Sequence, residues 1–283
     1  MKISELLVCC CLGALLLFPS TSFGNQKPKG DIKDGALVIS GDLTYDKVKE
    51  ALAPLMGKKQ KDGVTNGETI KIDKAFHAVD ADFVTIVNFT QSNEPSCSVE
   101  VPALVKTMVD VYYKDGCLSV KRNGNKRTAN NINEYVVVKI SAPKLTSLKL
   151  ATASKATIES LIQKNDVSVE VSAASTVAFG RVECPKLDIE SSGASEATFE
   201  NIKTESVVAD VNDASKVSLN GNMGNMMLEV SGCSTLKAKG KAANADMEVS
   251  GVSTVNILNL SCQNIKKNVD STSKIKEQST LIR

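Results

Sequence analysis

Aromatic side chains are scarce in this chain, which has no tryptophan, four tyrosines and seven phenylalanines among 283 residues. Stacking on aromatic rings is a common way to hold sugars and bases, so we expect neither a broad carbohydrate groove nor a platform for single-stranded nucleic acid. Histidine is scarcer still, because His77 is the only one. A Ser-His-Asp triad would depend on His77, and no nucleophile motif accompanies it.

Cofactor motifs and charge of one sign are also lacking. The cysteine and histidine spacings match no zinc pattern, and no glycine-rich loop has the spacing that cradles phosphate. We therefore expect no resident cofactor and no catalytic residue. The 34 basic side chains nearly balance the 32 acidic ones. Such a balance predicts no overall field that would attract nucleic acid or an acidic partner.

Long apolar runs are confined to the N-terminus. Lys2 precedes an apolar run from Leu6 to Phe18, and Ser22-Phe23-Gly24 offers small residues where a signal peptidase reads. We interpret residues 1–24 as a signal peptide cleaved before Asn25, so the mature chain is exported to the periplasm, the outer surface or the medium without a transmembrane segment. A lipidated cysteine among residues 9–11 is the alternative, but the residues before these cysteines fit it poorly.

The C-terminal half is an array of repeats. Each repeat has a serine after a small residue and two positions before an aliphatic one, and the serines are 19 to 21 residues apart. These marker serines are Ser154, Ser175, Ser195, Ser215, Ser234, Ser253 and Ser273. A period near 20 residues indicates a solenoid and sets the frame for every other motif.

Alternation of period two on both sides of each marker serine predicts short strands with one buried face. A unit of about 20 residues fits one coil of a parallel β-helix, in which each strand stacks on its equivalent in the next coil. We therefore predict an all-β fold, with a linker or N-terminal cap at residues 25–67 and a parallel β-helix domain at residues 68–283. The marker serines have the inward parity, which predicts a structural ladder of hydroxyl groups inside the tube.

Five cysteines follow the predicted signal peptide, an odd number for an oxidising compartment. Cys97 and Cys117 are one repeat length apart, each beside an alternating segment. If they stacked in neighbouring coils, their backbones would be about 4.8 Å apart, which a disulfide tolerates. We predict this bridge, with two unlinked core thiols as the alternative. Cys233 shares a column with four alanines, which predicts a small buried filler.

The corners of the repeat carry a resemblance to a known family. The segments Ser192-Gly193-Ala194-Ser195, Val230-Ser231-Gly232-Cys233-Ser234 and Val249-Ser250-Gly251-Val252-Ser253 stand between alternating strands. In this they resemble the head GIN domain family of auto-transporter adhesins, and the likeness extends from about Phe76 to Ile275. The resemblance implies a right-handed β-helix at the cell surface or in the periplasm. It implies no catalytic set.

Outward positions are where binding would be expected. Five residues before the marker serine, five successive repeats carry an acid, which we name the acidic column: Glu170, Glu190, Asp210, Glu229 and Glu248. Like charges about 4.8 Å apart repel, so the column predicts either a site for hard cations such as calcium or a solvated face that discourages sideways association. The other outward columns mix threonine, serine and lysine, which suits a weak polyvalent contact with a glycan or a protein.

The sequence thus predicts an exported, non-catalytic binding or structural module of the adhesin type. A polysaccharide lyase or glycoside hydrolase is the first alternative, because other parallel β-helices host such enzymes. A cation-dependent interaction protein that uses the acidic column is the second.

Overall fold

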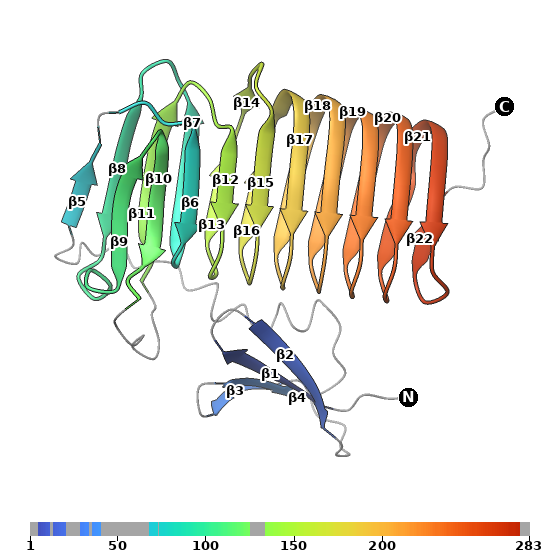
Figure 1. The fold of residues 1–283 in the computed structure, drawn as a ribbon, viewed down its shortest axis with the longest axis horizontal. Coiled ribbons are helices and arrows are strands. Elements are labelled where there is room, and N and C mark those ends of the chain that lie inside the picture. The colour runs from blue at the N-terminus through green and yellow to red at the C-terminus, as the bar shows by residue number, and fades with distance from the viewer. Residues whose placement is uncertain are drawn as a thin grey trace. The chain divides into compact units, whose positions relative to one another are not determined.

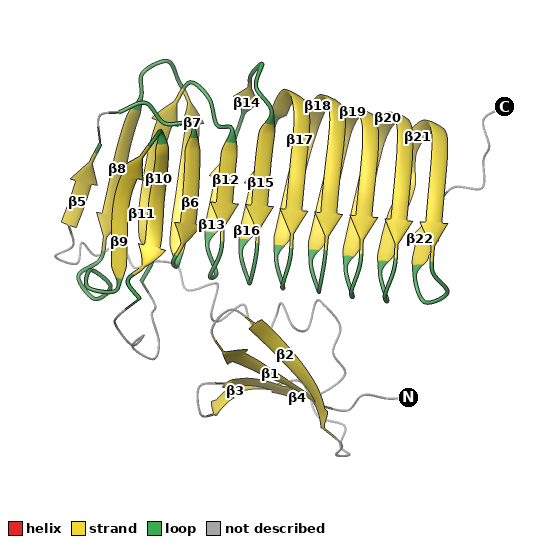
Figure 2. Ribbon diagram, viewed as in Figure 1, coloured by secondary structure: helices red, strands yellow, loops and turns green. Residues whose placement is uncertain are grey.

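The structure, a computed structural model, contains strands and turns and no helix among the residues that it describes (Figures 1 and 2). The described residues are 5–11, 14–20, 29–33, 36–40, 68–72, 74–124 and 134–277. The chain divides into two compact units, the first with strands β1–β4 and the second with strands β5–β22. Since no helix is present in these ranges, none of them holds a helix that would reach across a membrane.

The first unit is a small antiparallel sheet with the strand order β2-β1-β4-β3. Its strands are β1 (Glu5–Cys11), β2 (Ala14–Ser20), β3 (Lys29–Lys33) and β4 (Ala36–Ser40). The predicted cleavage point before Asn25 lies outside the described residues, so the signal peptide and the linker remain predictions.

The second unit is a β-solenoid of about six stacked turns with a repeat of about 20 residues. Its irregular first part comprises β5 (Glu68–Lys71), β6 (Ala78–Asp82), β7 (Thr85–Gln91), β8 (Ser96–Val101), β9 (Val109–Lys114), β10 (Cys117–Arg122) and β11 (Val136–Ala142). The next strands are β12 (Ser147–Leu150), β13 (Lys155–Ile158), β14 (Leu161–Ile162), β15 (Val167–Val171), β16 (Thr176–Phe179) and β17 (Val182–Ser191). The last are β18 (Glu196–Val211), β19 (Lys216–Val230), β20 (Thr235–Val249), β21 (Thr254–Val269) and β22 (Lys274–Lys276). The predicted parallel β-helix is confirmed.

From β12 onward all strand pairs are parallel and follow the predicted register. Ser168 opposes Ser147 at one end of the array, and Val249 opposes Val269 at the other. Each of the long strands β18–β21 runs along one wall of the tube, turns a corner and returns along another (Figure 1). Equivalent side chains of successive coils therefore lie about 4.8 Å apart in columns.

Alternating burial accounts for the strands. In β15 the pattern runs buried, exposed, buried, intermediate, buried, with Val167, Val169 and Val171 inside. Phe179 and Phe199 occupy one inward column of adjacent coils, where their rings stack with centroids 5.0 Å apart. The core is thus a set of columns to which each coil contributes one inward side chain per column. Its stability comes mainly from apolar surface removed from water.

The N-terminal end of the solenoid does not follow chain order. Strands β10 and β11 pair in parallel with one side of β6 and β7, and β12 and β13 pair with the other side. Strands β8 and β9 then add antiparallel to β11 and β10, and β5 adds to β8 (Figure 1). The chain thus folds back over its own first coil, and antiparallel strands cover that end of the tube.

Candidate functional site

Tight turns hold the marker serines in place. The residue two positions before the serine has a left-handed backbone in six successive repeats, at Thr152, Ala173, Gly193, Asp213, Gly232 and Gly251. A Cβ at Gly232 would lie 2.6 Å from the carbonyl oxygen of Asp213, so this position needs glycine for space as well as for its φ of 76°. The turn directs the following serine inward.

The structure places six of the seven marker serines in the core, each at most 1% exposed, and leaves Ser273 half-buried in the last coil. Ser154 Oγ lies 2.7 Å from the carbonyl oxygen of Phe83 and 2.6 Å from that of Ala151, and these two acceptors share its one hydroxyl proton. Ser175 Oγ accepts a hydrogen bond of 3.1 Å from the backbone N–H of Ser154. Ser234 differs, because its buried Oγ has no partner among the described residues. The hydroxyls of Ser154 and Ser175 therefore bond to backbone groups of the turns, and that of Ser234 does not.

Three polar residues that interrupt the inward apolar columns are explained by their contacts. Ser191 stands where its counterparts are valine or leucine, and its fully buried Oγ lies 2.8 Å from Ser195 Oγ. Lys267 and Glu277 break two different inward columns in the last coil, and they form an ion pair with each other. A charged pair at the end of the tube marks where the apolar core stops.

The acidic column is in register. Glu170 opposes Glu190, Glu190 opposes Asp210, and the pairing continues through Glu229 to Glu248. At its start Lys149 Nζ lies 2.5 Å from Glu170 Oε2, and this hydrogen bond and charge raise the pKa of Lys149. The column is therefore a row of stacked carboxylates with the Lys149 ammonium group at one end, and within it Asp210 Oδ1 is buried without a hydrogen-bond partner among the described residues.

Cation binding by the acidic column stays a prediction. No group of three or more histidine, cysteine or acidic side chains in the described ranges could hold a metal ion. The physical reason is geometric: carboxylates in a straight row present one or two oxygens to any point between them, and calcium takes six to eight ligands from all sides.

The prediction that Cys97 and Cys117 stack in neighbouring coils is wrong. Cys97 in β8 pairs with Ile140 of β11, and Cys117 in β10 pairs with Ala78 of β6 and Lys114 of β9. Their strands are not neighbours, because the chain folds back at this end, and both thiols are free. Burial raises the pKa of the Cys97 thiol to about 11. Cys233 also departs from its prediction, since it is exposed at the tip of a turn.

His77 has a structural place. Its backbone N–H donates to the carbonyl oxygen of Gly116 at 3.0 Å, and its own carbonyl accepts from the backbone N–H of Thr146 at 2.7 Å. A Cβ at Gly116 would lie 2.2 Å from the His77 ring, so the ring covers that glycine. These contacts tie the first coil to its two neighbours.

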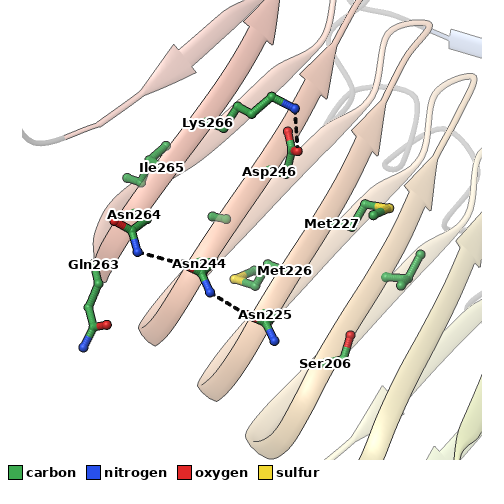
Figure 3. A pocket seen from close by; sticks show the side chains of 12 residues that line it. Ser206, Asn225, Met226, Met227, Asn244, Asp246, Gln263, Asn264, Ile265 and Lys266 are labelled. Atoms are coloured by element: carbon green, nitrogen blue, oxygen red, sulfur yellow. Dashed lines mark hydrogen bonds and ion pairs between the residues drawn. The ribbon is translucent and has the colours of Figure 1, made fainter.

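An open groove of about 570 Å³ crosses coils β18–β21 (Figure 3). Along it, Asn244 Nδ2 donates to Asn225 Oδ1 at 2.6 Å and Asn264 Nδ2 donates to Asn244 Oδ1 at 2.8 Å. Met227 is 61% exposed beside this asparagine ladder. The amides satisfy one another, so the ladder stabilises the wall.

The sequence prediction missed a gathering of lysines on the other wall of the last coils. The outward columns of mixed threonine, serine and lysine were expected, but the strand register also stacks Lys216 with Lys274 and Lys237 with Lys276, and Lys239 and Lys241 follow on β20. The available signal was the complete lack of acids in residues 216–224, 235–243, 254–262 and 274–276.

These features define a class of protein: a parallel β-solenoid whose outward walls present columns of polar and charged side chains at a fixed spacing. Residues 75–200 and 182–280 match the model of the family described as "Putative auto-transporter adhesin, head GIN domain". The chain belongs to this family, which confirms the resemblance seen in its Ser-Gly-X-Ser corners.

Solved structures share the fold. A protein described as a putative adhesin from Bacteroides fragilis is 19% identical with a TM-score of 0.54, over 75% of this chain and 97% of its own. A protein described as a putative lipid binding protein from Parabacteroides distasonis is 15% identical with a TM-score of 0.57, over 78% of this chain and 100% of its own. No curated protein matches this chain.

Proposed function

We propose that this protein is an exported, non-catalytic binding module of the adhesin type, which acts at the cell surface or in the periplasm and contacts a glycan or a protein. The observation that carries the proposal is the in-register wall of β18–β21, where each coil repeats the same outward positions. A repeated surface suits a polymeric or clustered ligand, because several weak contacts act together. Membership of a family described as putative adhesins also supports a binding function.

The alternatives have less support from the geometry. A polysaccharide lyase or glycoside hydrolase needs two acids whose environments differ, so that one donates a proton while the other stays charged. In the acidic column each carboxylate has the same position in its coil, and register alone singles out no such pair. The cation-dependent hypothesis has less support because, among the described residues, no group of three or more histidine, cysteine or acidic side chains is placed to hold a metal ion.

A comparison of cells that produce the protein with a deletion strain tests the proposal. We expect producing cells to adhere better to surfaces coated with glycan or matrix protein, and fractionation to recover the protein outside the cytoplasm. The purified protein should release no reducing ends or unsaturated products from acidic and neutral polysaccharides. Turnover of any of these polymers would contradict the proposal, as would equal adhesion by both strains.

A further inference from the structure

The C-terminal coils carry a wall on which lysines outnumber acidic side chains. The early halves of β19, β20 and β21, together with β22, contain no acidic residue between them. Outward lysines on these segments form what we name the basic face: Lys216, Lys237, Lys239, Lys241, Lys274 and Lys276. All but Lys216 are exposed.

Strand register fixes the spacing of these charges. Lys237 opposes Asn256, which opposes Lys276, so one coil separates the two lysines and their backbones are about 9.6 Å apart. Lys216 and Lys274 lie three coils apart in the neighbouring column. Separations of this size are close to the Debye length at physiological salt, so the lysines repel one another weakly and still act together on an anion.

Ion pairing distinguishes this face from the wall that carries the acidic column. On the acidic wall, Lys186 lies 2.8 Å from Asp188 and Lys266 lies 2.8 Å from Asp246. On the basic face only Lys216 has a carboxylate partner, Glu196 at 3.4 Å. The other five lysines pair with no acid among the described residues. Their charge is available to a ligand.

Polar side chains without charge lie between the lysines. Asn256 separates Lys237 from Lys276, and Thr235 and Thr254 lie between Lys216 and Lys274. Amides and hydroxyls donate and accept hydrogen bonds, as the hydroxyl groups of a sugar ring require. The segments of the basic face contain no aromatic residue that could stack on a base, and Leu258 is the only large hydrophobic exposed there.

We propose that the basic face binds an acidic polysaccharide, carboxylated or sulfated, whose chain runs across successive coils. The lysines meet its charged groups, and the intervening amides and hydroxyls meet its hydroxyl groups. This inference rests on the proposed function, because it names the ligand class of the same binding module. An anionic membrane or a nucleic acid would use the lysines without needing the interleaved polar residues.

The test compares the wild-type protein with two triple variants of equal charge change. Lys237→Gln, Lys239→Gln and Lys241→Gln together reduce the basic face. Lys114→Gln, Lys144→Gln and Lys164→Gln together remove three exposed lysines from earlier parts of the solenoid. Binding is measured by interferometry on immobilised dextran sulfate, polygalacturonate and neutral dextran at low and high salt, with anionic vesicles and duplex DNA in parallel. Thermal melting establishes that each variant is folded.

We expect the wild type to bind one or both acidic polymers, more weakly at high salt, and not neutral dextran. The basic-face variant should bind about tenfold more weakly, a loss that small contributions from three charges would give, and the control variant should bind like the wild type. A comparison of binding to dextran sulfate and to polygalacturonate shows whether the basic face prefers sulfate or carboxylate groups. Equal loss in both variants, binding to neutral dextran, or tighter binding to vesicles or DNA would overturn the proposal.

Failure of this inference is distinct from failure of the proposed function. Adhesion of producing cells without binding to either acidic polymer would reject the basic face and leave the binding module. Cleavage of polygalacturonate would reject the non-catalytic function even if the lysines were needed for binding.

Discussion

At the scale of single residues, the hydroxyl groups of the serine ladder differ in whether they have a hydrogen-bond partner. Ser154 Oγ is hydrogen-bonded to two carbonyl oxygens, whereas the buried Oγ of Ser234 has no partner within the described part of the chain. A buried polar group gains stability only when it is paired. The same residue type in the same column therefore has opposite effects in two coils.

Alanine substitutions at these serines test this difference. Ser154→Ala should lower the free energy of unfolding by about 1–3 kcal/mol, because the carbonyl groups of Phe83 and Ala151 lose the hydroxyl donor that they share. Ser234→Ala should leave stability unchanged or raise it slightly, since it removes an unpaired hydroxyl. Urea denaturation of the two variants provides the measurement. Equal destabilisation would show that the ladder acts as a uniform unit.

Thiol reactivity should follow burial. The pKa of Cys97 and that of Cys184 are both raised to about 11 by burial, while Cys233 is exposed. At mildly alkaline pH, iodoacetamide should label Cys233 first, and Cys233→Ala should remove that fast phase. Intact mass should show no disulfide between Cys97 and Cys117. Rapid labelling of Cys97, or a mass lower by two hydrogens, would contradict this assignment.

The raised thiol pKa values also have a consequence for stability. The unfolded chain ionises near the ordinary thiol pKa of 9.0, while the folded chain keeps these thiols neutral up to about pH 11. Stability should therefore fall as the pH rises between these values.

Within the ladder and the core, the sequence predicted which residues point inward, because alternation along a strand decides which side chains are buried. The hydrogen-bond partner of each hydroxyl could not be predicted, because it depends on backbone positions in the neighbouring coil.

At the scale of the structural element, the turn is the most constrained part of a coil. Asp270 closes the last turn: its carboxylate accepts from the backbone N–H groups of Ser273 and Thr272, and from Gly251 in the coil before. Hydrogen bonding from Ser273, supported by Gly251 and Thr272, lowers the pKa of Asp270 to about 2. The turn thus depends on a charged group.

This dependence predicts an acid-sensitive last coil. Because the pKa of Asp270 is lowered on folding, its stabilising effect is present above about pH 3.8 and is lost as the pH falls toward 2. In Asp270→Asn, hydrogen exchange at the Gly251 amide should be faster at neutral pH and should respond less to acid. Asp246→Asn is the control, since that carboxylate contacts Lys266 and no turn amide. An unchanged acid response in Asp270→Asn would refute the role of the charge.

Elements in the regular array were predictable, and those at the N-terminal end were not. From Ser147 onward a fixed period places every strand over its equivalent. Between Glu68 and Ala142 the hydrophobic pattern indicates strands but not their partners, because antiparallel and parallel neighbours bury the same face. Strands β10 and β11 pair with β6 and β7, which are distant in the sequence. For this reason the spacing of one repeat length between Cys97 and Cys117 did not indicate that they are in contact.

At the scale of the whole molecule, charge balance conceals charge separation. The formal net charge of +2 predicted no field for an acidic partner, yet acids stack on one wall, and five of the six lysines of the basic face have no acidic partner among the described residues. The net charge sums the charges on all walls of the solenoid, whereas a ligand contacts only one wall. The acidic column could be predicted because it repeats in five successive coils, and the basic face could not, because none of its columns carries a lysine in every coil.

The central claim is that successive coils stack in register, since the acidic column and the basic face both follow from it. Spin labels at Lys149→Cys and Asn268→Cys, in a Cys233→Ala background, test it by double electron–electron resonance. These positions share one column across six coil steps, so the solenoid predicts backbone positions about 29 Å apart and one narrow distance peak. A much shorter, much longer or broadly spread distance would contradict the stacking and with it both charged walls.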